Sequence, residues 1–95
     1  MRAIEIRMIK ALQSKRNFHE SNTSVEFDNG NTYVYLFGNC IYKVVNGKAY
    51  FTLAGWNTPT TRSRLSALGI HVTQKNWMPY YNGVLINTNV WYKAD

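Results

Sequence analysis

The stretch that decides the fold is residues 24–53, which read SVEFDNGNTYVYLFGNCIYKVVNGKAYFTL. Apolar and polar residues alternate here with the period of two that is typical of β-strands. Turn signals interrupt the alternation at Asn29-Gly30, Gly38-Asn39 and Asn46-Gly47. Asn-Gly pairs favour tight hairpins, because both central residues of such a turn need a positive φ. The stretch therefore predicts an antiparallel meander of four short strands.

Side chains on successive strand residues point to opposite faces, so the alternation also predicts which residues share a face. In the expected strand 32–37, Tyr33, Tyr35 and Phe37 lie on one face, and Val34 and Leu36 on the other. In the strand before it, residues 26 and 28 are acidic and share a face, where solvation and solubility are their simplest role. The strands that follow are expected at 41–45 and 49–53.

The residues before the meander predict an N-terminal helix over 1–16. One side of this helix is apolar at helical spacing, and it is made of Met1, Ile4, Met8, Ala11 and Leu12. Arg7, Lys10 and Ser14 fall on the other side. We expect the helix to pack on the sheet; the alternative is a basic amphipathic helix that docks on a membrane or a partner. Residues 17–23 are polar and predict a connector.

A second, shorter helix is predicted over residues 58–69. Thr58 can cap its start, Pro59 suits the first helical position, and Gly69 can end it in a left-handed conformation. Short strands are expected after it at 70–74, 77–81 and 84–86, with a final one at 90–92. Pro79 restricts its own segment to a sheet edge or an irregular run. The whole pattern predicts an α+β fold in a single domain, residues 1–95.

Composition excludes several classes of protein. The 95 residues carry a formal net charge of +6, and their acidic residues are Glu5, Glu20, Glu26, Asp28 and Asp95. From Asn29 to Ala94 there is no carboxylate, while six basic residues fall there. The chain has one cysteine and two histidines, too few for an intrachain disulfide or for a zinc site. Neither a signal peptide nor an apolar stretch of about 20 residues is present, so we expect a soluble protein of a reducing compartment without membrane contact.

Catalysis is not expected either. Cys40 enters an apolar strand, as a small buried hydrophobic residue does, and nothing places His19 or His71 beside a nucleophile. The sequence holds no glycine-rich phosphate loop and no dinucleotide fingerprint, so we expect no cofactor. An enzyme using Cys40 or His71 stays open as a third hypothesis, which requires activity that is lost when either residue is changed.

Positive charge beside aromatic residues and helix amides is the remaining signal. Helix N-termini hold phosphates readily, and arginine adds bidentate contacts with phosphate oxygens. Aromatic faces next to cations are also typical of single-stranded nucleic-acid sites, although the same residues fill small β-rich cores. The alternative for the helix start is that its threonines only cap and its arginines are solvated or stack on tryptophan. The candidate phosphate-binding or nucleic-acid-binding residues are Trp56, Thr60, Thr61, Arg62, Arg64, Lys75 and Trp77.

Several segments together resemble a known family. They are residues 22–26, 34–39, 55–57, 60–68 and 74–75, of which the Thr-Thr-Arg-Ser-Arg-Leu run at 60–65 is the most specific. The chain resembles a family of small proteins of unknown function encoded by tailed bacteriophages, over roughly residues 5–86. Phe37 stands where that family commonly has a histidine. The resemblance implies a phage origin and residence in the cytoplasm of the infected host, and it brings no catalytic residues.

Two hypotheses for function follow. The first is a non-enzymatic protein that binds nucleic acid or another phosphate-bearing ligand through the 58–69 helix start and nearby aromatics. The alternative is a phage inhibitor of a host or anti-phage defence protein, acting by protein–protein contact or by capture of a nucleotide. A homo-oligomer is compatible with either.

Overall fold

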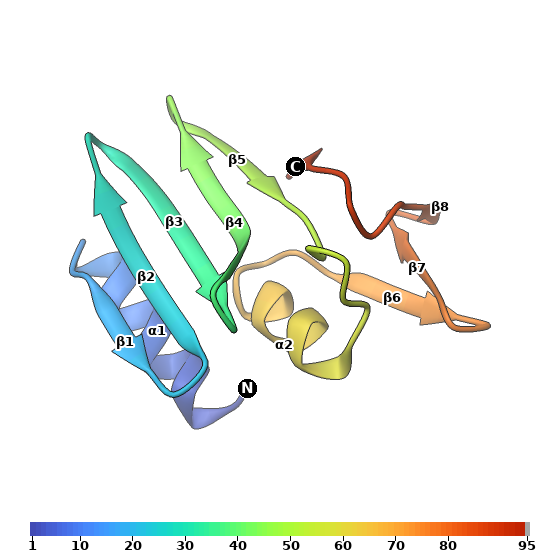
Figure 1. Ribbon diagram of the computed structural model, residues 1–95, viewed down its shortest axis with the longest axis horizontal. Helices are drawn as coiled ribbons and strands as arrows, with labels where there is room; N and C mark the ends of the chain where they lie inside the picture. Colours follow the sequence, from blue (N-terminus) through green and yellow to red (C-terminus); the bar gives the residue numbers. More distant parts are fainter. Residues whose placement is uncertain (95) are drawn as a thin grey trace.

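The computed structural model describes residues 1–94 and folds them into two helices and two antiparallel sheets (Figure 1). The helices are α1 (Ala3–Gln13) and α2 (Pro59–Ala67). The strands are β1 (Phe18–Glu20), β2 (Thr23–Asp28), β3 (Asn31–Leu36), β4 (Asn39–Val45), β5 (Lys48–Phe51), β6 (Val72–Lys75), β7 (Met78–Tyr81), β8 (Val84–Leu85) and β9 (Tyr92–Lys93). The larger sheet has the order β1-β2-β3-β4-β5-β9 and the smaller sheet the order β6-β7-β8. The predicted α+β fold, with its N-terminal helix and antiparallel meander, is confirmed.

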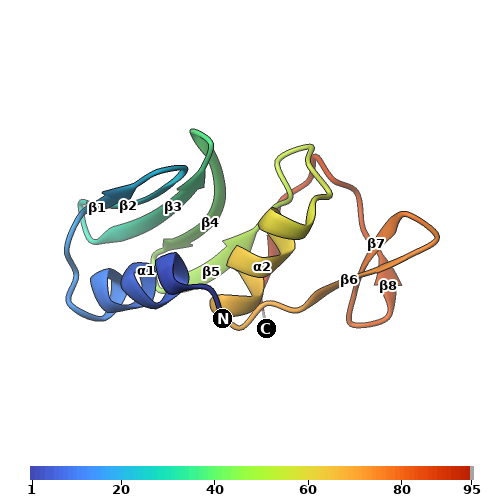
Figure 2. The ribbon, with the colours of Figure 1, turned by 90° about the horizontal axis from the view of Figure 1, so that it is seen from below.

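The two helices lie on the same side of the larger sheet. Figure 2 shows α1 beneath β1–β3, and α2 between α1 and the smaller sheet, which lies at the far end of the molecule. The molecule measures 37 × 29 × 20 Å, and Figure 1 shows the smaller sheet at one end of its longest axis. Among residues 1–94, no helix packs on the other face of the larger sheet. We call that second face the open face.

A single hydrophobic core joins all the layers. Phe51 on β5 is fully buried, and its ring meets the edge of the Tyr81 ring of β7 with centroids 4.7 Å apart. This contact ties the smaller sheet to the larger one. Apolar burial of this kind stabilises a fold by about 25 cal/mol per Å² of surface. The buried core consists of Met8, Val25, Val34, Leu36, Ile41, Phe51, Leu53, Leu65, Ile70, Val72 and Ile86.

The ends of α2 follow the sequence signals. The Thr58 side chain accepts a hydrogen bond from the Thr61 backbone N–H (3.2 Å), and Pro59 is the first helical residue. At the other end Gly69 has φ +86°, and the backbone N–H of Ile70 donates to the Leu65 carbonyl. This pattern is a Schellman motif, in which a left-handed residue lets the chain turn back on the last helical carbonyls. The short capped helix is therefore confirmed, and it spans Pro59–Ala67 within the predicted range 58–69.

Two details of the meander differ from the prediction. The second turn uses Phe37-Gly38, one residue earlier than expected, because Leu36 already pairs with Asn39. Phe37 therefore lies at a hairpin tip with φ 51°, and it does not share a strand face with Tyr33 and Tyr35. The polar segment 17–23, expected as a connector, contains the short edge strand β1, which pairs with β2.

The prediction that Pro79 restricts its segment to a sheet edge or an irregular run is wrong, because β7 is the central strand of the smaller sheet and pairs with both neighbours. The Pro79 carbonyl accepts from the Ile86 N–H at 3.0 Å, just beyond the end of β8 at Leu85. Proline thus lies just beyond the last pair of the β7–β8 ladder, Tyr80 with Leu85, so its missing N–H breaks no interior bond of that ladder. The expected final strand shifts to β9, which joins the edge of the larger sheet beside β5.

Candidate functional site

The hydroxyls at the start of α2 are already engaged. Thr61 is buried, with its Oγ1 2.9 Å from Thr58 Oγ1, and its backbone N–H is bonded to the same cap. Thr60 is half-buried and accepts a hydrogen bond from Arg2 Nη1 at 3.4 Å. Both predicted threonines therefore support the helix and its neighbours in this structure.

Arg64 points inward and is only 3% exposed. Its Nη1 lies 2.7 Å from Glu5 Oε2, its Nε donates to Thr23 at 2.9 Å and its Nη2 to Asn22 at 3.2 Å. Each nitrogen of the guanidinium thus has a partner on α1 or at the start of β2. Arg64, predicted to contact phosphate, instead holds α2 against the rest of the fold.

Glu5 is the other half of this buried pair. It was not among the apolar residues expected to face the sheet, yet it is 1% exposed, whereas Met1 is solvent-exposed. Burial by itself raises the pKa of the Glu5 carboxyl. Hydrogen bonds from Ser63, the Arg2 backbone and Arg64, together with the charge of Arg64, outweigh burial and hold that pKa below its ordinary value.

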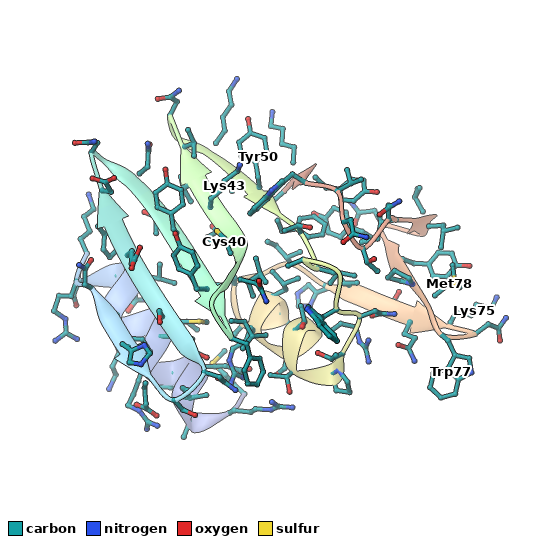
Figure 3. The ribbon with its side chains drawn as sticks, viewed as in Figure 1. Cys40, Lys43, Tyr50, Lys75, Trp77 and Met78 are labelled. Atoms are coloured by element: carbon teal, nitrogen blue, oxygen red, sulfur yellow. The ribbon has the colours of Figure 1, made fainter. Side chains whose placement is uncertain are left out.

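The other predicted residues lie around the start of α2 and the tip of the smaller sheet. Arg62 is half-buried, and its Nη1 donates to Asn57 (2.5 Å) and to Gln74 (2.9 Å). Trp56, 62% exposed, borders a mostly apolar groove of about 420 Å³ between the β3–β4 turn and the start of α2. Lys75 and Trp77 lie at the tip of the smaller sheet, where the Trp77 carbonyl accepts a hydrogen bond from Asn57 Nδ2 at 3.3 Å, next to the cap of α2. Their side chains point away from the body of the molecule in Figure 3. Asn57 thus links Arg62 to the backbone of Trp77, whereas Arg64 faces the interior.

A different constellation lies on the open face of the larger sheet. Strand pairing places Tyr33 opposite Lys43, Lys43 opposite Tyr50, and Tyr50 opposite Lys93. The row therefore alternates aromatic and cationic side chains across β3, β4, β5 and β9, on strands that lie about 4.8 Å apart. Figure 3 shows Lys43 and Tyr50 side by side on this face. We call this set the sheet row: Tyr33, Lys43, Tyr50 and Lys93.

A shift of register creates the sheet row. Tyr35 pairs with Cys40 but Val34 pairs with Tyr42, so β4 contributes one extra residue between the two pairs. Ile41 is buried and Tyr42 packs against the core, which leaves Lys43 on the open face. Without that extra residue every later side chain of β4 would change face.

Trp91 extends the sheet row near its cationic end. The Lys43 ammonium lies 4.1 Å from the centre of the Trp91 ring and 5.9 Å from that of Tyr50. Such distances are those of cation–π contacts, which hold the lysine between the two rings. The acidic residue of this row, Glu26 on β2, lies beyond Tyr33 at the opposite end. Positive charge is therefore concentrated toward β4, β5 and β9.

The groups considered for catalysis have other contacts. The Cys40 thiol donates to the Tyr42 carbonyl at 3.4 Å, and burial raises its pKa, which disfavours a thiolate. His71 Nδ1 lies 3.2 Å from Ser66 Oγ. Within residues 1–94, no three His, Cys, Asp or Glu side chains lie close enough to hold a metal ion. In the same part of the chain, neither helix has the length and apolar character needed to cross a bilayer.

Comparison with known families identifies the origin of the chain. The model of the Kyanoviridae Gp96 protein family matches residues 1–95. The chain belongs to this family. It is therefore a phage protein, and the resemblance to a bacteriophage family is confirmed. No curated protein and no solved structure matches the chain significantly.

In this member of the Kyanoviridae Gp96 family, some residues of the sheet row could be recognised from patterns in the sequence. The alternation places Tyr33 and Tyr35 on one face, and the run at 91–93 pairs aromatics with a lysine. What was missing was the register that brings Lys43 and Tyr50 to the same face as Tyr33. The pairing of Lys93 with Tyr50 joins residues more than 40 positions apart, which no local pattern reveals.

Proposed function

We propose that this phage protein binds single-stranded nucleic acid on the open face of its larger sheet. The observation that carries the proposal is the sheet row, in which Tyr33 and Tyr50 alternate with Lys43 and Lys93 across neighbouring strands. Non-specific single-strand sites combine cations that follow the phosphates with rings that stack bases, at ~1–3 kcal/mol per base. The sheet row has both components within one surface.

The charge distribution supports the same proposal. Lys43 and Lys93 belong to the segment 29–94, which has no carboxylate, so nothing in that segment repels a phosphate backbone. The protein as a whole carries +6, which favours association with a polyanion. The face is an open sheet, and stacking on its rings needs bases that are not already covered by neighbouring bases. A single strand meets that requirement and an intact duplex does not.

The start of α2 is a weaker candidate for phosphate. Arg64 is buried in an ion pair, and the hydroxyl of Thr61 is bonded to the helix cap. A ligand there would have to compete with contacts that stabilise the fold. The proposal is therefore for a non-enzymatic binding protein that acts in the cytoplasm of the infected cell through its sheet.

Fluorescence anisotropy with a labelled single-stranded oligonucleotide tests this function. We expect Tyr50→Leu and Lys43→Gln each to weaken binding at least fivefold, since each removes one element of the sheet row. Lys10→Gln is the matched control, because Lys10 is an exposed cation on α1, on the opposite side of the sheet. Equal losses for Lys43→Gln and Lys10→Gln, or no binding by the unmodified protein in dilute buffer, would overturn the proposal.

A host protein is the second candidate partner, and the groove beside α2 is the observation that favours it. Phe37 and Trp56 border this groove and are 71% and 62% exposed. Exposed rings around an apolar hollow are typical of protein–protein contacts. Native mass spectrometry of the protein purified from infected cells separates the two candidates. A retained host protein released by Trp56→Ala supports this second function, whereas a retained oligonucleotide supports the first.

A further inference from the structure

Trp77 occupies an unusual position at the tip of the β6–β7 hairpin. Lys75 pairs with Met78, so the hairpin loop consists of Asn76 and Trp77 alone. Both loop residues have positive φ, 52° and 66° respectively. Bulky side chains are rarely found in this left-handed region, because the Cβ atom approaches the backbone too closely. The tryptophan therefore holds a strained backbone conformation.

Three other hairpins of this chain avoid that strain. The loops at 29–30, 46–47 and 82–83 are Asn-Gly, and glycine takes the second left-handed position in each. Trp77 fills the place where those loops have glycine. Burial of the side chain does not compensate for the strain, because it is 85% exposed, the highest value among the large apolar residues described. The Trp77 carbonyl accepts from Asn57 Nδ2 at 3.3 Å, a backbone contact that does not require a tryptophan. Strain that the fold itself does not need is typical of functional positions.

The surroundings of Trp77 indicate the ligand. Lys75 is exposed next to it and points away from the body of the molecule, as Figure 3 shows. Met78, Val84 and Leu85 are also largely exposed on the same small sheet. No carboxylate occurs in this sheet, so the tip combines a stacking ring with unopposed positive charge. That combination is complementary to a nucleotide, whose base can stack and whose phosphate is negative.

We infer that Trp77 and Lys75 form a second contact for the same single strand that the sheet row binds. This inference rests on the proposed function and adds a second binding contact further along the same nucleic-acid strand. The smaller sheet lies at one end of the 37 Å axis, with the sheet row nearer the middle. A longer strand on the sheet row extends further toward Trp77 than a short one, so it has more chance to engage both contacts. Affinity should therefore rise steeply once the strand is long enough to reach Trp77.

The test measures the affinity of single strands of about 4 and about 16 nucleotides, the range over which one small β-domain binds. We expect Trp77→Gly to weaken binding of the long strand at least fivefold, and to weaken binding of the short strand much less. The same substitution should raise the midpoint of thermal unfolding, because it restores the glycine that such a turn favours. A loss of affinity in a more stable protein cannot be attributed to misfolding.

Two further variants sharpen the test. Trp77→Phe keeps a stacking ring and should recover most of the affinity for the long strand. Trp77→Leu keeps an apolar side chain without a ring and should not. If Trp77→Leu binds like the unmodified protein, or if Trp77→Gly has no effect on binding of the long strand, the inference is overturned. The proposed binding by the sheet row is not affected by either result. If the unmodified protein binds neither strand, the proposed function itself fails.

Discussion

Arg64 shows how the surroundings of one residue decide its role. In sequence it stands two positions after Arg62 at the start of a helix, where an arginine suits phosphate. In the fold it lies against Glu5, Thr23 and Asn22. A charge buried at 3% exposure needs such partners, because removing it from water is costly unless it is paired.

The first prediction concerns the stability contributed by this pair. Arg64→Ala leaves the Glu5 carboxylate buried without its cation, and we expect the free energy of unfolding to fall by about 3–5 kcal/mol. Urea denaturation followed by circular dichroism measures this value. Arg7→Ala is the comparison, since Arg7 and Glu20 form an ion pair in which both side chains are well exposed to water. A loss for Arg64→Ala no larger than that for Arg7→Ala would contradict the structural role.

The second prediction concerns pH. The pKa of Glu5 is lower in the folded protein than its ordinary value of 4.5, so the unfolded chain takes up the proton first. The stabilisation is therefore complete above about pH 4.5 and is lost as the pH falls through the folded-state pKa. Thermal unfolding between pH 7 and pH 3 measures the effect. Glu5→Gln should reduce the loss of stability over this range, and an unchanged acid dependence would exclude Glu5 as its source.

Among the elements, the hairpins and the helix ends depend on a few left-handed residues. Gly69 ends α2 with φ +86°, and a Cβ added there would meet no atom within 4 Å. Backbone strain is therefore the main cost of an alanine at this position. Trp77 presents the opposite case, in which a large residue already bears that strain.

The third prediction compares these two positions. Gly69→Ala should lower the free energy of unfolding by about 1 kcal/mol, and Trp77→Gly should raise it by a similar amount. Both values come from chemical denaturation of otherwise unmodified protein. If Trp77→Gly is destabilising, the ring contributes to the fold, and the argument from uncompensated strain is wrong.

In the whole molecule, the uneven distribution of charge along the chain places acidic and basic residues on different parts of the surface. Glu5 and Glu20 are engaged by arginines, and Glu26 lies at the β2 end of the open face. The strands from β3 to β9 carry cations without carboxylates among them. Binding of a polyanion to this face should therefore release counterions and depend steeply on salt.

The fourth prediction concerns that dependence. Each phosphate contact of a single strand contributes ~0.7 to the slope of log K against log salt concentration. The double variant with Lys43→Gln and Lys93→Gln should make the slope shallower by about 1.4, which is twice that contribution. Titrations between low and physiological salt measure it. A slope equal to that of the unmodified protein would mean that neither lysine contacts phosphate.

Much of the architecture could be predicted because its causes are local. Asn29-Gly30 and Asn46-Gly47 define two-residue loops, and the capping threonine with the closing glycine defines α2. The register between β3 and β4 could not be predicted, because a single extra residue in β4 has no composition signal of its own. The burial of Arg64 was equally hidden, since Glu5 lies 59 positions away along the chain.

The sequence by itself determined the two helices, the antiparallel meander between them, and a segment of 66 residues, 29–94, without negative charge. These features depend on neighbours in the chain and on composition. Only the tertiary structure decided which cations reach solvent together. The shifted register turned Lys43 outward, the pairing of β5 with β9 added Lys93, and the ion pair with Glu5 withdrew Arg64. Each of these outcomes depends on contacts between distant segments, which form only when the core closes.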